Sequence, residues 1–236
     1  MNFKNMKATF LNITAVTLAI TMLQSCLKSN DDYSELVPNA VVTVKPDGNS
    51  FYLQLDDETV LYPSNLTKSP FGDKEVRAFT NYKDDKNIDG KKTVIVNWLR
   101  EMLTQETDES KGSKEADIKE YGNDPVEIIN LFPTVCEDGY LTLRFEAPWS
   151  RNSAVQHRIS LITGTDKDDP YTVVLRHNAF DDEQDVIATS YVSFRLDKLP
   201  DTKGETVTLK VKFLSPEGEK TAKFDYKTRP SDSVKE

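Results

Sequence analysis

Short runs of alternating apolar and polar residues, separated by turn-forming residues, begin at residue 40 and continue almost to the end of the chain. Phe51, Leu53 and Leu55 alternate with Tyr52 and Gln54, directly after a Pro-Asp-Gly-Asn turn at 46–49. Because successive side chains of a strand point to opposite faces, this alternation predicts strands with one buried face. No long stretch after the N-terminal segment carries a helical apolar stripe, so the sequence predicts an all-β fold.

The second half of the chain repeats this rhythm, with turns such as Asp138-Gly139 and Pro200-Asp201 between the runs. Several short strands at such spacing predict a β-sandwich. Between the two halves, residues 104–118 are polar and densely charged, which favours a linker over a short helix because one Gly and two Ser interrupt them. The strand candidates of the second half are 126–132, 140–147, 154–163, 171–177, 187–196, 205–213 and 220–226.

Longer segments follow one another in a recognisable order. FYLQLDDETVLYPSN (51–65) precedes EDGYLTLRFEAP (137–148), PYTVVLRHNA (170–179) and FRLDKLPDTKGETVTLKV (194–211). This order resembles the NigD-like lipoproteins over nearly all of the chain that follows the N-terminal segment. The resemblance implies an N-terminal OB-like barrel and a C-terminal β-sandwich. It implies little chemistry: some members lie beside bacteriocin genes, which suggests an immunity role.

The pattern and the resemblance together predict the order of the parts along the chain. An all-β protein is expected, with the OB-like barrel preceding the β-sandwich behind a signal peptide. The expected ranges are a lipoprotein signal peptide at 1–25, an acidic tether at 26–38, an OB-like β-barrel at 39–110, a linker at 111–122, a β-sandwich at 123–228 and a disordered tail at 229–236.

The N-terminal segment has the three parts of a secretory signal. Lys4 and Lys7 precede an uncharged run at 8–23, and the segment closes on Leu23-Gln24-Ser25-Cys26. A transmembrane anchor is the alternative, but a bilayer core of ~30 Å needs about 20 apolar residues, and this run is short and contains Thr and Asn. Leu23-Gln24-Ser25-Cys26 resembles a lipobox, although Gln24 departs from the usual small or aliphatic residue. We therefore expect lipid attachment at Cys26, with palmitate-type acyl chains as the membrane anchor.

The residues after Cys26 bear on localisation. Ser29 is followed by Asp31 and Asp32, which looks like the surface-export signal of lipoproteins in some Gram-negative anaerobes. A solvated acidic tether is the simpler interpretation. We expect an outer-membrane protein exposed at the cell surface, with the periplasmic face as the alternative.

Charge and cysteine content exclude several classes of protein. The chain has a net charge of −9, and loss of residues 1–25 removes two basic and no acidic residues, which gives −11. Such a surface repels phosphates, so a nucleic-acid partner is not expected. With Cys26 acylated, Cys136 has no partner within the chain, and no disulfide framework forms. No cofactor is predicted.

One motif resembles the start of a calcium-binding loop. Asp85, Asn87 and Asp89 stand at alternate positions before Gly90, the arrangement by which oxygen ligands surround a hard cation. The twelfth position of such a loop needs a carboxylate, yet it is Val96 here. A hairpin turn on Asp89-Gly90 explains the same residues, so the metal assignment is only a weak candidate.

The sequence contains few other candidates for chemistry. His157, His177 and Cys136 stand in no zinc or nucleophile motif, so they are expected to be structural. The acidic clusters at 166–169 and 181–185 suit solvated loop tips better than paired catalytic carboxylates. No enzymatic activity is therefore expected.

Trp149 is a weak candidate for ligand binding, because its Pro- and Ser-containing surroundings suggest a loop in which the ring is exposed. The alternative is a ring that fills a core. Asp232-Ser233-Val234 resembles a short O-glycan acceptor motif, a pattern easily met by chance. Three functions remain open: a non-catalytic surface module that binds an unknown protein, as in bacteriocin immunity; a glycan-binding accessory; and, more remotely, a hydrolase.

Overall fold

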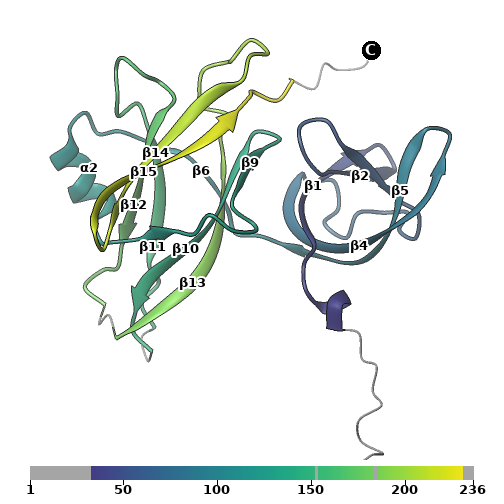
Figure 1. Cartoon of the computed structure of the whole chain (residues 1–236), viewed down its shortest axis with the longest axis horizontal. Helices are drawn as coiled ribbons and strands as arrows, with labels where there is room; N and C mark the ends of the chain where they lie inside the picture. The colour runs from purple at the N-terminus through teal and green to yellow at the C-terminus, as the bar shows by residue number, and fades with distance from the viewer. Residues whose placement is uncertain (1–32, 152–153, 183–184, 231–236) are drawn as a thin grey trace, which may run out of the picture. The chain divides into compact units, whose positions relative to one another are not determined.

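The computed structural model describes residues 33–151, 154–182 and 185–230, and strands dominate it (Figure 1). Cys26 and Ser233 lie outside these residues. The chain divides into two compact units, 1–37 and 38–236. The described part of the first unit contains one 3-10 helix, η1 (Tyr33–Leu36), and the second unit contains both the barrel and the sandwich. In the described ranges, no helix is long and apolar enough to cross a bilayer.

The first domain is a closed five-stranded barrel with the strand order β1-β2-β3-β5-β4. Neighbouring strands are antiparallel except β3 and β5, which run parallel. Residues of the alternating segments fill its interior, among them Val42, Phe51 and Leu61. The all-β fold and the barrel are confirmed. Its strands are β1 (Ala40–Asp47), β2 (Ser50–Gln54), β3 (Val60–Pro63), β4 (Val76–Ile88) and β5 (Lys91–Glu101).

Strand β1 is buried on both faces. Ala40, Val42 and Val44 belong to the barrel core. The intervening Thr43 and Lys45 are also buried, with 0% and 8% of their surface exposed. They hydrogen-bond with Arg77 and Asp138 respectively. A strand that is covered on both sides does not need to alternate apolar residues on a buried face with polar residues on an exposed face. This explains the consecutive apolar residues Val41 and Val42.

The second domain is a sandwich of two sheets, and the prediction of a sandwich is confirmed. One sheet has the order β6-β13-β10-β8, with β9 also paired to β10. The other has the order β15-β14-β12-β11-β7. The strands are β6 (Thr104–Glu106), β7 (Asp108–Glu109), β8 (Glu127–Ile128), β9 (Val135–Glu137), β10 (Tyr140–Trp149), β11 (Arg158–Thr163), β12 (Thr172–Asn178), β13 (Val186–Arg195), β14 (Val207–Ser215) and β15 (Gly218–Tyr226).

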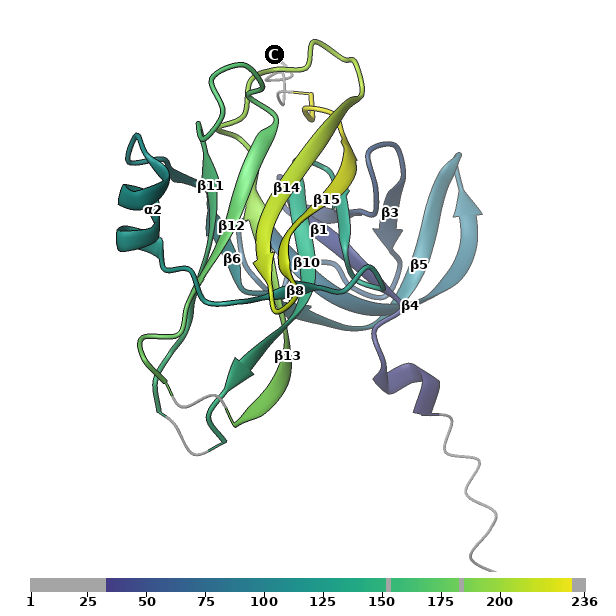
Figure 2. The same ribbon diagram turned by 60° about the vertical axis from the view of Figure 1, so that its left-hand side comes forward.

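The two sheets of the sandwich share one apolar core. Leu143, Phe145 and Phe194 extend into it from the β10–β13 pair, and Leu175 and Val211 from the facing sheet. Alternate residues of β12 and β14, such as Val174 and Lys212, point to the opposite face of their sheet. A helix, α2 (Lys114–Tyr121), contacts β11 and β12, beside which it lies in Figure 2. The sheet therefore has an outer face that α2 covers only in part.

The expected domain boundary differs from the structure. Residues 104–110, which the sequence analysis assigned to the barrel, include β6 and β7, and these strands pair in parallel with β13 and β11 of the sandwich. The expected linker at 111–122 is mostly α2, which begins at the N-cap Ser113 and ends at Gly122. Its charged sequence resembles a solvated linker because only Asp117 and Tyr121 are buried. The chain thus passes from barrel to sandwich near Leu103, without a free linker.

The first residue of the expected tail, Arg229, has a defined place in the structure. Arg229 is held in the structure, because its Nη1 donates to Glu75 Oε1 at 2.7 Å. Thr202 and Thr228 exchange two hydrogen bonds through their backbone amides and side-chain hydroxyls. The expected disordered tail at 229–236 is therefore wrong for Arg229. Residues 231–236 lie outside the described ranges.

Candidate functional site

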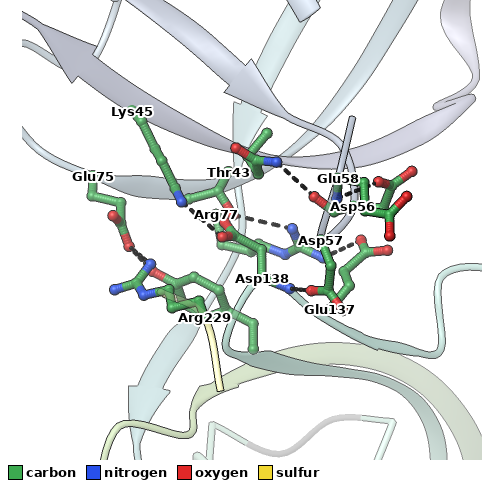
Figure 3. A network of polar contacts seen from close by, with 12 residues as sticks. Thr43, Lys45, Asp56, Asp57, Glu58, Glu75, Arg77, Glu137, Asp138 and Arg229 are labelled. Atoms are coloured by element: carbon green, nitrogen blue, oxygen red, sulfur yellow. Dashed lines mark hydrogen bonds and ion pairs between the residues drawn. The ribbon is translucent and has the colours of Figure 1, made fainter. Parts of the chain in front are cut away.

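The barrel and the sandwich are joined by a network of buried ion pairs around the tip of the β9–β10 hairpin (Figure 3). Asp138 and Gly139 form its two-residue turn, with φ of 46° and 73°, as the Asp-Gly signal predicted. Lys45 Nζ of the barrel lies 2.7 Å from Asp138 Oδ1, and both side chains are almost fully buried. The backbone amide of Asp138 donates to Asp57 Oδ1 at 2.6 Å. The hairpin tip is thus held both by strand β1, through Lys45, and by the β2–β3 loop, through Asp57.

Arg77 lies at the centre of this network with 0% of its surface exposed. Its Nη2 is 2.6 Å from Glu137 Oε1, while Nη1 and Nε donate to the hydroxyls of Thr43 and Thr142. Burial raises the pKa of Glu137 even though the Arg77 guanidinium opposes that shift. A buried guanidinium without these acceptors would cost several kcal/mol, so the three partners are required.

Glu75 of the barrel binds the segment after β15, through Arg229, to the same network. Its Oε1 accepts hydrogen bonds from Tyr140 Oη at 2.6 Å, from Arg229 at 2.7 Å and from Arg195 at 3.2 Å. Burial would raise the pKa of Glu75, but the hydrogen bonds from Tyr140 and Arg229 bring it below its usual value. Asp138 Oδ2 is buried without a hydrogen-bond partner among the described residues, but the ionic groups of the network pair with one another, which identifies it as a structural clamp.

The residues of the calcium-like motif do not form a metal site of the usual kind. Asp85 and Asn87 lie within β4, and Asp89-Gly90 is the tight turn to β5, with φ of 50° and 76°. Both angles are positive, as a type I′ hairpin turn requires. In the described residues, no group of three or more His, Cys, Asp or Glu side chains could hold a metal. Lys92, 3.7 Å from Asp84, supplies positive charge to this hairpin.

Trp149, the weak candidate for ligand binding, has the packed ring that was the alternative interpretation of its sequence context. It is the last residue of β10, and its indole packs against the sandwich core. One face stacks on the imidazole of His157, with ring centroids 3.8 Å apart and planes 9° apart. The indole Nε1 is buried without a hydrogen-bond acceptor among the described residues. Because His157 covers one face, Trp149 does not offer a free platform for stacking on a sugar.

The two histidines, far apart in the sequence, form one buried chain of hydrogen bonds. His157 Nδ1 lies 2.9 Å from His177 Nε2, and His157 Nε2 lies 3.0 Å from Asp182 Oδ2. His177 Nδ1 lies 3.1 Å from the carbonyl oxygen of Pro125. Burial lowers the pKa of His177. Nothing in the sequence indicates that these two histidines meet.

Every ring nitrogen in this chain of hydrogen bonds has a partner. The Pro125 carbonyl can only accept, so a neutral His177 carries its proton on Nδ1 and accepts from His157 Nδ1. His157 Nε2 is occupied by the Asp182 carboxyl group. Because all four ring nitrogens are occupied, neither histidine offers a free base for catalysis.

Cys136 is likewise unsuited to chemistry. Its side chain packs against the sandwich core on β9. Burial raises the pKa of its thiol far above the ordinary range, and the neighbouring Asp57 and Glu137 carboxylates add to that shift. Because the thiolate is the nucleophilic form, Cys136 is inert at neutral pH.

The outer face of the second sheet carries a pocket of about 540 Å³. Its floor includes Val174 and Arg176 of β12 and Lys212 and Leu214 of β14. The register pairs Val174 with Lys212 and Lys212 with Thr221, so one row of side chains crosses three strands. The walls come from the loop before α2, from the loop after β11 and from the start of β15. This is the candidate binding site.

Local hydrogen bonds hold the walls of this pocket. The Ser110 amide donates to the Thr163 carbonyl, which attaches the loop before α2 to β11. Asp117 of α2 accepts from the Lys111 amide and from the Ser110 hydroxyl, so its carboxylate closes that loop. Across the opening, Lys114 Nζ lies 2.6 Å from Glu219 Oε1, and both side chains are largely exposed. The pocket is therefore built on hydrogen-bonded elements with one exposed ion pair at its rim.

The comparisons with known proteins agree with this architecture. A model of the NigD-like N-terminal OB domain matches residues 41–102, and a model of the NigD-like C-terminal β-sandwich domain matches residues 109–226. No curated protein matches the chain.

Several solved structures share the fold. A protein from Parabacteroides distasonis described as toxin-related is 38% identical, with a TM-score of 0.64 over 80% of this chain and 92% of its own. A NigD-like immunity protein from Bacteroides caccae is 22% identical, with a TM-score of 0.54 over 79% and 95%. A Bacteroides fragilis protein described as a lipoprotein is 16% identical, with a TM-score of 0.54 over 81% and 98%. With both domains matched in order and a 38% identical structural relative, the chain belongs to the NigD-like family.

Proposed function

We propose that this protein is a non-catalytic lipoprotein of the outer membrane, anchored through Cys26 and exposed at the cell surface, whose sandwich pocket binds a partner. The observation that carries the proposal is the pocket of about 540 Å³ on a rigid sheet, lined by charged and hydroxyl side chains. Its volume falls within the range of about 300–1,000 Å³ that is typical of ligand sites. The groups that would serve catalysis, His157, His177 and Cys136, are tied into buried structure.

The structure supports a binding role over a hydrolase. The Asp182 carboxylate is occupied by His157 and by the Ser150 amide. In the acidic cluster at 166–169, Asp166 and Asp169 accept hydrogen bonds from their own loop backbone. These carboxylates shape turns, as Asx residues commonly do. A glycan remains a candidate partner, but Trp149 is no longer the residue expected to bind it.

The immunity role is the more specific version of this proposal. It is favoured by the fold shared with a NigD-like immunity protein and by the 38% identity to a toxin-related protein. In this version the partner is a bacteriocin or the receptor that a bacteriocin needs. Deleting the gene should then sensitise the producing strain to its own toxin, and unchanged survival would remove the immunity role while leaving partner binding open.

The proposal is tested by capturing the partner from the native cell envelope. The wild type and a Cys26→Ser variant are compared with a Lys212→Met variant of the pocket and with Lys119→Met, an exposed lysine of α2 outside the pocket lining. We expect the wild type and Lys119→Met to retain the same partner after crosslinking, and Lys212→Met to lose it. Cys26→Ser should move from the membrane fraction to the soluble fraction. Equal capture by all pocket and control variants would refute the assignment of the pocket.

A further inference from the structure

We propose that the sandwich pocket recognises a sugar acid, a small hydroxyl-bearing ligand with one carboxylate, through Arg176. This inference rests on the proposed binding function and names the chemistry of the ligand. The first argument is local charge. Two acidic residues line the pocket, Asp117 and Glu219, against five basic residues: Lys114, Lys167, Arg176, Lys212 and Lys220. Of these five, Lys114, Lys212 and Lys220 are paired with carboxylates, and Arg176 is the buried one that is not.

The positive pocket contrasts with the rest of the molecule, since the chain has a net charge of −9. Basic side chains from five separate segments meet there. A concave patch of one sign on a protein of the opposite sign concentrates a ligand of complementary charge. The ligand is therefore expected to be an anion.

Arg176 is the residue that most needs such a ligand. It retains only 8% of its surface exposed and lies in the floor of the pocket. Among the described residues its guanidinium makes one side-chain hydrogen bond, from Nη1 to Asn123 Oδ1. Its Nε is buried without an acceptor. A desolvated guanidinium with no paired carboxylate is unfavourable, and an arriving anion would relieve that cost.

The neighbouring acids do not serve as that partner. Both oxygens of the Asp117 carboxylate are engaged by the Lys111 amide and the Ser110 hydroxyl. Glu219 is paired with Lys114 at the rim. Burial lowers the pKa of Arg176, with Asp117 and Glu219 opposing that shift only through space. The guanidinium therefore remains available for a carboxylate, whose two oxygens can accept parallel hydrogen bonds from two of its N–H groups.

The charge of the lining also distinguishes a carboxylate from a phosphate. Because three of the lining lysines are already paired with carboxylates, little unpaired positive charge is left, which suits a monoanion better than a dianion. The hydroxyl oxygens of Ser110, Thr165 and Thr221 can accept hydrogen bonds from ligand hydroxyls. Val174 and Leu214 provide apolar contact beneath them. A monosaccharide or disaccharide acid fits this combination of charge, hydroxyl acceptors and volume.

The test is a calorimetric titration of the full chain in detergent. Glucuronate, glucose and inorganic phosphate are the probes. We expect glucuronate to bind at least about tenfold more tightly than either glucose or phosphate, with affinity falling as salt is raised. Undetectable glucuronate binding, equal binding of glucose, or tighter binding of phosphate would each overturn the proposal.

Variants connect the binding to the pocket. Arg176→Lys keeps the positive charge but removes the planar pair of N–H donors. Lys212→Met removes an exposed charge without disturbing the fold. Each variant should weaken the binding of glucuronate at least about tenfold. Glu219→Gln should strengthen it severalfold, and Lys119→Met should leave it unchanged. Unchanged affinity in both Arg176→Lys and Lys212→Met would overturn the assignment. Because the titration needs neither the anchor nor an envelope partner, its failure is distinguishable from failure to capture a partner.

Discussion

Single buried residues determine how this molecule responds to acid. His177 is 1% exposed and lies between His157 and the Pro125 carbonyl. A second proton on His177 would require Nε2 to donate toward His157 Nδ1, which already donates toward it. Protonation therefore breaks the chain of hydrogen bonds that joins the end of β12 to the acidic loop containing Asp182.

The expected consequence is a loss of stability in mild acid. Burial lowers the pKa of His177 in the folded state, so the unfolded chain binds more protons as the pH drops below about 6.5. The free energy of unfolding should fall between about pH 7 and about pH 5, by up to about 1.4 kcal/mol per pH unit. His177→Gln should flatten this dependence, as measured by urea unfolding at several pH values.

The exposed Lys223→Gln variant serves as the control, because lysine does not titrate in this range. It should keep the slope of the wild type. If His177→Gln and Lys223→Gln show the same slope, the histidine chain does not govern the acid response.

At the scale of elements, α2 depends on the residue that ends it. Gly122 has a φ of +87°, and a Cβ there would lie 2.5 Å from His177 O and from Asn178 Cβ. Gly112, before the helix, has a similar φ of +94° but open space around it. Comparing alanine substitutions at these two glycines separates the free-energy cost of a left-handed backbone from the cost of a clash against β12.

We expect Gly112→Ala to lower the free energy of unfolding by about 1–2 kcal/mol, the cost of left-handed backbone alone. Gly122→Ala should lose that amount and about 1–3 kcal/mol more, because the clash is with backbone that cannot move aside. Urea unfolding of both variants gives the comparison. Equal losses would show that the helix end tolerates displacement from β12.

The sequence predicts the strands well where local chemistry determines them. Alternation and Asp-Gly turns anticipated the hairpins at 89–90 and 138–139 and most strands of the sandwich. It did not anticipate β6, β7 or α2, because these short polar segments are stabilised by pairing and packing against distant strands. Their own residues carry no apolar pattern to read.

The candidate site was beyond the reach of sequence patterns for the same reason. The pocket lysines and Arg176 come from five segments spread over residues 114–220, and no spacing rule joins them. His177 lies on β12 and His157 directly precedes the adjacent strand β11, which the strand order shows but their separation in the sequence does not. The one available hint was Arg176 itself, a charged residue directly after the apolar run 173–175.

At the scale of the whole molecule, the buried clamp should make the barrel and the sandwich unfold together. Arg77→Met leaves Glu137 part-buried without its partner, and breaking a buried pair of this kind costs about 3–5 kcal/mol. We expect one calorimetric transition in the wild type and two in Arg77→Met, as the barrel loses its support first.

Arg158→Met provides the matched control, because its pair with Asp108 at 3.3 Å is partly exposed. Such a pair contributes about 0–1 kcal/mol, so this variant should keep one transition. A single transition in Arg77→Met, with stability equal to that of Arg158→Met, would contradict the clamp.

The buried thiol of Cys136 has a practical consequence for studying the protein. At neutral pH a maleimide dye reacts with thiolate, and burial keeps this thiol protonated. Cysteines introduced at exposed positions, for example at Lys86 of the barrel and Lys119 of the sandwich domain, should therefore take up fluorophores while Cys136 stays unlabelled. Distances between the barrel and the sandwich can then be followed by energy transfer with the native cysteine left in place.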